Sequence, residues 1–189
     1  MKNLSPQTKK LYQLAACGML IAISVIFQVF HIGYPTQWGM WIDVVAIPWL
    51  IIYFLFGFRM AFITSLISSF VIALVAPSGF LGAFMKFTAT FPMFALPALI
   101  SLRSQEKMDI FRKFGWLLLA LVTAIIARAI LVIPLNYYFA IPIWTGMTAK
   151  QAMTFIPPLI IFGLNALQGT LETLVAWLIV YKFNLKRFR

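Results

Sequence analysis

Six long apolar runs, separated by short segments rich in proline, glycine or charged residues, constrain the fold of this chain more than any other feature. A helix needs about 20 apolar residues to cross the hydrocarbon core of a bilayer, which is about 30 Å thick. We expect spans over residues 11–32, 42–57, 60–76, 80–102, 114–139 and 159–181. These spans use most of the 189 residues, so the sequence predicts a single integral membrane domain over 1–189, an all-α membrane protein built as a compact bundle of six transmembrane helices.

The charge of the chain orients this bundle. A formal net charge of +11 would indicate a nucleic-acid partner in a soluble protein, but here it follows from topology. With the N-terminus inside, most basic residues face the cytoplasm: Lys2, Lys9, Lys10, Arg59, Arg103, Lys107, Arg112, Lys113, Lys182, Lys186, Arg187 and Arg189. By the positive-inside rule we expect both termini to be cytoplasmic. The chain would be a multi-pass protein of the cell (plasma) membrane. Its surroundings would be the lipid bilayer, and no nucleic acid is expected as a partner. The segment 103–113 is expected to be the one clearly hydrophilic interior loop.

Polar residues inside the spans require an explanation, because a charged group at the bilayer centre costs at least a few kcal/mol. They are Lys86, Arg128, Asn136, Asn165, Gln168 and Glu172. Asn165, Gln168 and Glu172 follow the spacing i, i+3 and i+7, which places them on one face of the last helix. They either join helices by hydrogen bonds, with Glu172 neutralised by Arg128 or Lys86, or they contact a ligand. The sequence leaves both interpretations open.

The three carboxamides favour a ligand. Asn136, Asn165 and Gln168 lie in the outer halves of their helices in the expected topology, and a carboxamide offers both donors and acceptors to a heterocycle or to hydroxyl groups. Tyr137 lies at the same level, as part of an aromatic belt or as a stacking partner. Asp43 begins the second span, where a carboxylate is favourable at a helix N-terminus.

No metal site or catalytic motif is expected. His31 is the only histidine and Cys17 the only cysteine, and Cys17 lies within an apolar run. The sequence has no G-x-x-x-x-G-K-[ST] phosphate loop, no H-E-x-x-H pair and no G-x-S-x-G elbow. These absences give an enzyme little support from the sequence, and an intramembrane lipid-modifying enzyme and a scaffold subunit without a ligand are kept as hypotheses of other classes.

The motifs resemble those of a transporter family. Asp43-Val-Val-Ala-Ile-Pro48, Arg128, Leu135-Asn136-Tyr137-Tyr138 with Pro142, and Asn165-Ala166-Leu167-Gln168-Gly169 are similar to segments of the substrate-binding S components of energy-coupling factor (ECF) vitamin transporters. The riboflavin-specific branch is the most similar. This resemblance implies a receptor that captures a vitamin from outside, associates with a transmembrane coupling subunit and two cytoplasmic ATPases, and topples in the membrane during uptake.

The resemblance also implies which residues act. Asn136 and Asn165 match the asparagines that hold the flavin ring in the riboflavin branch, and Gln168 stands at the position of a lysine. A second acid of that branch is replaced by Ala46. The expected substrate contacts are Asn136, Asn165, Gln168, Asp43, Tyr137 and Lys86. The expected contacts to the coupling subunit form a small-residue face on the first helix, consisting of Ala15, Gly18 and Ala22.

Other vitamins remain alternatives within the same family. A carboxylate vitamin such as biotin or pantothenate, or folate, would call for a basic group, which Lys86 or Arg128 supplies. Cationic thiamine would favour Glu172 with aromatic faces. Riboflavin, in contrast, is neutral and flat with one polar edge. It would be bound as the transported ligand, and no cofactor is expected.

Overall fold

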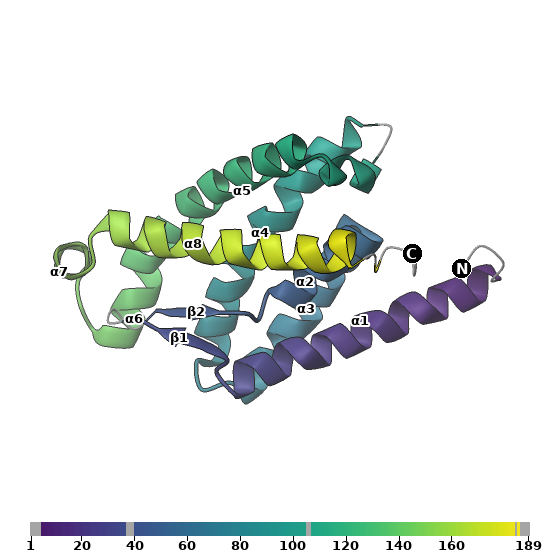
Figure 1. Ribbon diagram of the computed structural model, residues 1–189. Coiled ribbons are helices and arrows are strands. Elements are labelled where there is room, and N and C mark those ends of the chain that lie inside the picture. The colour runs from purple at the N-terminus through teal and green to yellow at the C-terminus, as the bar shows by residue number, and fades with distance from the viewer. Residues whose placement is uncertain (1–4, 37–39, 105–106, 184, 186–189) are drawn as a thin grey trace.

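The structure is a computed structural model that describes residues 5–36, 40–104, 107–183 and 185. It is an arrangement of helices with one small hairpin (Figure 1). Its elements in chain order are α1 (Pro6–Val29), β1 (Gly33–Pro35), β2 (Trp41–Asp43), α2 (Ile47–Phe56), α3 (Phe58–Val75), α4 (Gly79–Leu102), η1 (Lys107–Arg112), α5 (Phe114–Leu135), η2 (Asn136–Ala140), α6 (Ile141–Thr145), α7 (Ala149–Phe155), α8 (Pro158–Trp177) and η3 (Leu178–Lys182). Of the expected cytoplasmic basic residues, Lys2, Lys186, Arg187 and Arg189 lie outside the described residues.

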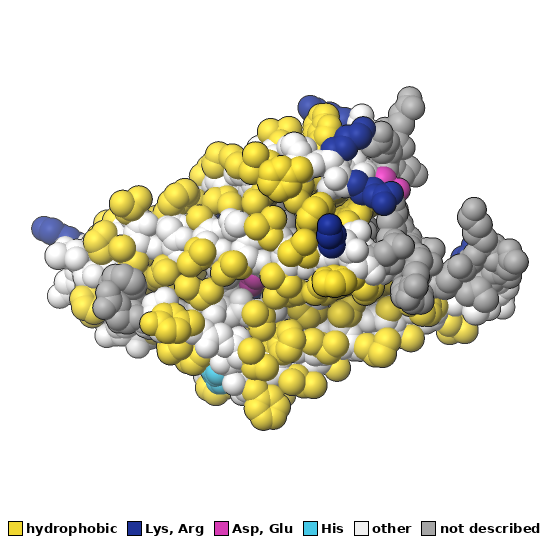
Figure 2. Space-filling model, in the orientation of Figure 1, with side chains coloured by type: hydrophobic (Ala, Val, Ile, Leu, Met, Phe, Trp, Pro, Cys, Tyr) yellow, Lys and Arg dark blue, Asp and Glu magenta, His cyan; other side chains and the backbone are white. Residues whose placement is uncertain are grey.

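Five helical segments of the described chain are long and apolar enough to cross a membrane. They are Pro6–Val29, Phe58–Val75, Gly79–Leu102, Phe114–Thr145 and Pro158–Lys182. Each contains most of one span expected from the sequence. Side chains facing away from the bundle are large and apolar, as a lipid-facing surface requires, and hydrophobic side chains cover most of the visible face in Figure 2.

The expected span over 42–57 differs from the structure. The helix there, α2, begins only at Ile47 and has 10 residues. At 1.5 Å per residue it extends about 15 Å, which is half the thickness of a bilayer core. The reason is that residues 41–43 pair as a strand instead of extending the helix. The count of six membrane crossings therefore stays a prediction.

Helix α2 is the centre of the bundle. Eight of its ten residues are buried, because its sequence is apolar on every side and a helix of that kind is stable only when surrounded. It contacts α1, α3 and α8. Gly57 separates α2 from α3 with φ of +85°, a left-handed conformation that glycine adopts without strain and that lets the chain turn back at once.

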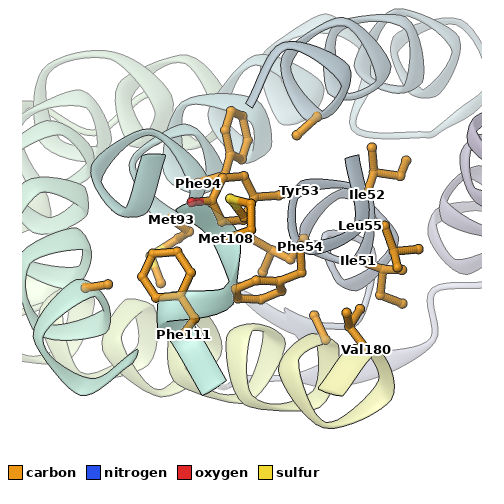
Figure 3. Close-up of a cluster of buried hydrophobic side chains, with 14 of the residues drawn as sticks. Ile51, Ile52, Tyr53, Phe54, Leu55, Met93, Phe94, Met108, Phe111 and Val180 are labelled. Carbon is orange, nitrogen blue, oxygen red and sulfur yellow. The ribbon is translucent and has the colours of Figure 1, made fainter. Parts of the chain in front are cut away.

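The segment expected to be a hydrophilic loop folds into the bundle instead. In η1, Met108, Ile110 and Phe111 are buried among side chains of α2, α4 and the end of α8 (Figure 3). The indole Nε1 of Trp177 donates to the carbonyl of Phe111 at 2.8 Å, and the hydroxyl of Tyr181 donates to that of Met108 at 2.6 Å. In the sequence these three apolar residues of η1 stand among the charged residues of 103–113, so the sequence pattern predicts a hydrophilic segment. This end of the bundle is closed by packed aromatic and aliphatic side chains.

Residues 33–36, which look like a breaker-rich turn in the sequence, begin an antiparallel hairpin. Gly33 pairs with Asp43, Tyr34 with Ile42 and Pro35 with Trp41. A Cβ on Gly33 would lie 2.5 Å from the carbonyl oxygen of Ile42, so the close approach of the strands requires glycine there. The hairpin places Asp43 over the bundle.

The two ends of the bundle differ in character. The start of α1, the α4–α5 connection and the end of α8 lie at one end, whereas the hairpin, α6 and α7 lie at the other (Figure 1). Dark-blue Lys and Arg side chains gather at the first end, and dark blue also appears near α7, the helix that contains Lys150 (Figure 2).

Candidate functional site

A cavity of about 340 Å³ lies among the hairpin, α1, α4, α5, η2, α6 and α8. Its polar lining consists of Gln28, His31, Asp43, Ser78, Lys86, Arg128, Asn136, Asn165 and Gln168. Its apolar lining consists of Met40, Trp41, Gly82, Met85, Ala89, Val132 and Trp144. Small-molecule sites occupy about 300–1,000 Å³ and combine apolar walls with a few polar groups, so the cavity is large enough for a compact ligand. Five of the six expected substrate contacts line it.

Asn136 reaches the cavity through an irregular turn. Helix α5 contains Pro134 and passes at Asn136 into η2, a π-helical turn of five residues. Such single π turns are frequent at functional sites because they change the direction of the side chains that follow. The amide nitrogen of Asn136 donates to the carbonyl of Val132 at 2.8 Å, and the side chain is 6% exposed.

The polar face of α8 meets Arg128 of α5. The guanidinium donates from Nε to Asn165 Oδ1 at 3.0 Å and from Nη2 to Gln168 Oε1 at 3.4 Å. Gln168 in turn donates from Nε2 to Glu172 Oε1 at 3.2 Å, and Asn165 donates from Nδ2 to the carbonyl of Ile161 at 2.9 Å. The i, i+3, i+7 spacing therefore produces one continuous hydrogen-bonded face, as the sequence predicts.

Four charged side chains form an alternating chain beside the cavity. Lys86 Nζ contacts Asp43 Oδ1 and lies 3.1 Å from Glu172 Oε1, and Arg128 Nη1 lies 3.6 Å from Glu172 Oε2. Asp43 Oδ1 also accepts the backbone N–H of Val45 at 3.0 Å, which holds the carboxylate at the start of α2. The sequence left open whether Glu172 is neutralised by Arg128 or by Lys86, and in the structure it contacts both.

The charges of this network cancel, since it contains two cations and two anions. Buried ions need partners because taking a charge out of water costs several kcal/mol. Glu172 and Arg128 are 0% and 1% exposed, so neither has access to solvent charge screening. Among the described residues that line the cavity, each charged side chain is thus already paired inside the protein.

Two tryptophan side chains contribute to the lining of the cavity. Trp41 of β2 packs against His31 with ring centroids 5.3 Å apart and planes inclined by 60°, and Trp144 of α6 lies on the cavity wall. His31 adopts φ of +49° where α1 ends. The histidine thus has an aromatic neighbour, and the described residues contain no group of three His, Cys, Asp or Glu side chains that could hold a metal ion.

Comparison with known proteins assigns the family. The family model described as ECF transporter, substrate-specific component, matches residues 12–186. This chain belongs to the ECF transporter S components. The S component of a bacterial ECF transporter, known from a solved structure, has the same fold with a TM-score of 0.71 and 21% sequence identity, over 95% of this chain and 99% of that chain. A search of the curated proteins gives no match.

Membership in this family gives the cavity its general role. ECF S components are substrate-binding transport subunits and not enzymes, and they bind a small molecule and work with an ECF transmembrane and ATPase module. The cavity with its carboxamides and paired charges is the candidate substrate site of this S component.

Tyr137, the sixth expected substrate contact, does not line the cavity. It is 1% exposed within a hydrophobic cluster that includes Met85 and Val132, and its hydroxyl donates to the carbonyl of Ile156 at 2.5 Å. In this S component Tyr137 packs in that cluster and connects η2 to Ile156, the residue that follows α7. Its role in binding stays a prediction.

The expected contact face for the coupling subunit is available in the structure. Ala15, Gly18 and Ala22 are all exposed on α1, and no atom lies within 4 Å of a Cβ added at Gly18. Only Cys17 and Ser24 of α1 are buried, so one side of this helix holds it to α2 and α3 and the other is free.

Several cavity residues of the S component gave no signal in the sequence. Met85, Ala89 and Val132 are apolar residues within apolar helices, and nothing in their identity separates cavity walls from core. Gln28 is the exception, because it is a polar residue in the outer part of the first span and could have been added to the set of polar residues inside the membrane.

Proposed function

We propose that this S component binds riboflavin or a related flavin from outside the cell for ATP-driven import. The observation that carries the proposal is a cavity with four neutral carboxamides, Gln28, Asn136, Asn165 and Gln168, in which every charged side chain of the lining is paired within the protein. Such a site suits a ligand that is neutral and has many hydrogen-bonding groups.

The shape and lining support a flat heterocycle. The isoalloxazine ring of riboflavin has an apolar end and one polar edge with carbonyl and ring-nitrogen groups. Trp41, Met85 and Trp144 would contact the ring, and the carboxamides would meet its polar edge. Gln28, Ser78 and His31 on the same cavity offer partners for the hydroxyl groups of the ribityl chain.

The pairing of charges argues against charged vitamins. Biotin or pantothenate would need a free base, but Lys86 already contacts two carboxylates and Arg128 already contacts Glu172 and two amide oxygens. Thiamine would need a free acid, but Glu172 has both cations beside it. Breaking a buried pair to bind such a ligand costs about 3–5 kcal/mol, which a neutral ligand avoids.

Import would use the rest of the transporter. We propose that the exposed face of Ala15, Gly18 and Ala22 packs against the coupling subunit, and that the two ATPases of the complex supply the energy. Both termini would lie in the cytoplasm, because the basic residues gather at the end of the bundle where α1 begins and α8 ends. The substrate cavity at the opposite end would then face outward.

Titration of the detergent-purified protein with riboflavin tests the proposal. Because Trp41 and Trp144 line the cavity, bound riboflavin is expected to quench tryptophan fluorescence to saturation. Asn165→Leu should weaken binding about five- to thirtyfold, since one or two hydrogen bonds of about 1 kcal/mol each are lost. Gln7→Leu, the loss of an exposed carboxamide on α1, serves as the control and should bind like the wild type. Saturable binding of biotin, pantothenate or thiamine, with none of riboflavin, would contradict the assignment.

A further inference from the structure

Arg128 has an unusual position for a charged residue. It lies in the middle of α5, is 1% exposed, and directs all three nitrogen atoms of its guanidinium toward α8. Nε meets Asn165 and Nη2 meets Gln168, while Nη1 faces Glu172. A role in ion pairing alone would need only the contact to Glu172.

The chemistry of these contacts determines how both carboxamides are turned. A guanidinium has donors and no acceptor, so the amide atoms that face Arg128 are the oxygens of Asn165 and Gln168. A carboxylate has acceptors and no donor, so the atom of Gln168 that faces Glu172 is the nitrogen. Beside Arg128 and Glu172, the amide groups of Asn165 and Gln168 thus have only one orientation in which all of these contacts are favourable.

We propose that Arg128 and Glu172 are positioning residues that set the hydrogen-bonding polarity of the substrate site. They hold the amide oxygens of Asn165 and Gln168 toward the guanidinium of Arg128. The amide nitrogen of Asn165 donates one hydrogen to the carbonyl of Ile161, and that of Gln168 donates one to Glu172. The second hydrogen of each amide has no acceptor among the described residues and is the donor offered to the ligand. Asn165 and Gln168 therefore select acceptor groups on the ligand.

This inference rests on the proposed function for its ligand and makes that function more specific. The carbonyl oxygens and unprotonated ring nitrogens of the isoalloxazine match these N–H donors, and its one ring N–H would meet an acceptor such as Asn136 Oδ1, because the amide nitrogen of Asn136 already donates to Val132. An edge that presents amino groups would face donors with donors and be rejected. Arg128 and Glu172 would thereby control specificity through the orientation of Asn165 and Gln168.

The orientation of the amides is tested without any ligand by two isosteric changes. Asn165→Asp places a carboxylate at 3.0 Å from Arg128 Nε but loses the donor to the carbonyl of Ile161, so the gain on one side offsets the loss on the other and its melting temperature should fall only slightly. Gln168→Glu places a carboxylate where the amide nitrogen lies 3.2 Å from Glu172, so it should melt at a lower temperature. Equal destabilisation by both changes would overturn the assigned orientation.

The positioning role is tested by the charge-neutral double variant Arg128→Gln/Glu172→Gln. It removes one cation and one anion, keeps a side chain able to hydrogen-bond at each position, and leaves Lys86 beside Asp43. Glutamine both donates and accepts, so the carboxamides lose their fixed orientation. Riboflavin binding should weaken by about tenfold, the effect of about 1.4 kcal/mol in hydrogen bonding.

Selectivity separates positioning from a general structural effect. The probe is a riboflavin analogue in which one ring carbonyl is replaced by a thiocarbonyl, a weaker acceptor. The wild type should prefer riboflavin, and the double variant should lose most of that preference. An unchanged preference, or wild-type affinity for riboflavin in the folded double variant, would overturn the proposal. Absence of riboflavin binding by the wild type would contradict the proposed function instead, and the ligand-free melting comparison would still decide the orientation.

Discussion

Lys86 is the central member of the charged chain, and its removal should destabilise the protein strongly. Lys86→Met keeps the length of the side chain and removes the charge between Asp43 and Glu172. These three side chains are 11%, 15% and 0% exposed, so the network is screened only slightly by water. Loss of one partner from a buried pair costs about 3–5 kcal/mol.

The structure places the expected cost near the lower limit of that range. Glu172 keeps Arg128 at 3.6 Å and the amide of Gln168 at 3.2 Å, and Asp43 keeps the N–H of Val45. We therefore expect a loss of about 3 kcal/mol, which corresponds to about 6–12 °C in the melting temperature of a chain of this size. The assay is thermal unfolding in detergent, followed by tryptophan fluorescence.

Two further variants make the Lys86 prediction specific. Lys150→Met makes the same change at an exposed position on α7 and should alter the stability by no more than about 0.5 kcal/mol. Asp43→Asn added to Lys86→Met should restore about half of the lost stability, because Glu172 and Arg128 then balance. A Lys86→Met variant as stable as the Lys150→Met control, or no recovery in the double variant, would refute the reasoning from charge balance.

Three other changes test single features of the fold. Gly33→Ala should cost about 1–3 kcal/mol in thermal unfolding, since the new Cβ would lie 2.5 Å from a carbonyl oxygen of β2, whereas Gly115→Ala meets no neighbour and should be neutral or slightly stabilising. Gly18→Leu should keep the fold and substrate binding but abolish co-purification with the coupling subunit, whereas the control Gly163→Leu on α8 should still co-purify. Co-purification retained by Gly18→Leu would contradict the proposed contact face. Tyr137→Phe should lower stability by about 1 kcal/mol and leave riboflavin affinity unchanged, and a large loss of affinity would instead make Tyr137 a ligand contact.

The long helices could be predicted from the sequence because a bilayer imposes a length and an apolar composition on each. The hairpin and the short α2 could not be predicted in this way. Gly33 and Pro35 are breakers in isolation, and only their pairing with residues 41–43 makes them a strand. Likewise, the apolar residues of η1 lie among charged ones, so the sequence shows a hydrophilic loop where the structure buries Phe111 completely.

The candidate substrate site could be predicted in part for the same physical reason. Asn165, Gln168 and Glu172 share a helix face by spacing alone, and a membrane leaves such residues few alternatives to the bundle interior. The contact of Lys86 with Asp43 joins residues on different elements, and helical periodicity carries no information about it. The same holds for Tyr137, which lies beside Asn136 in sequence but is directed into a hydrophobic cluster.

The most direct test of the central claim is the absorbance spectrum of the purified protein between about 350 and 500 nm, a range in which flavins absorb, followed by mass spectrometry of the small molecule released on denaturation. The account predicts a flavin spectrum, or its appearance after addition of riboflavin and removal of the excess, because the neutral carboxamide cavity retains the ligand. A protein that stays colourless after this treatment and releases a different vitamin would contradict the account.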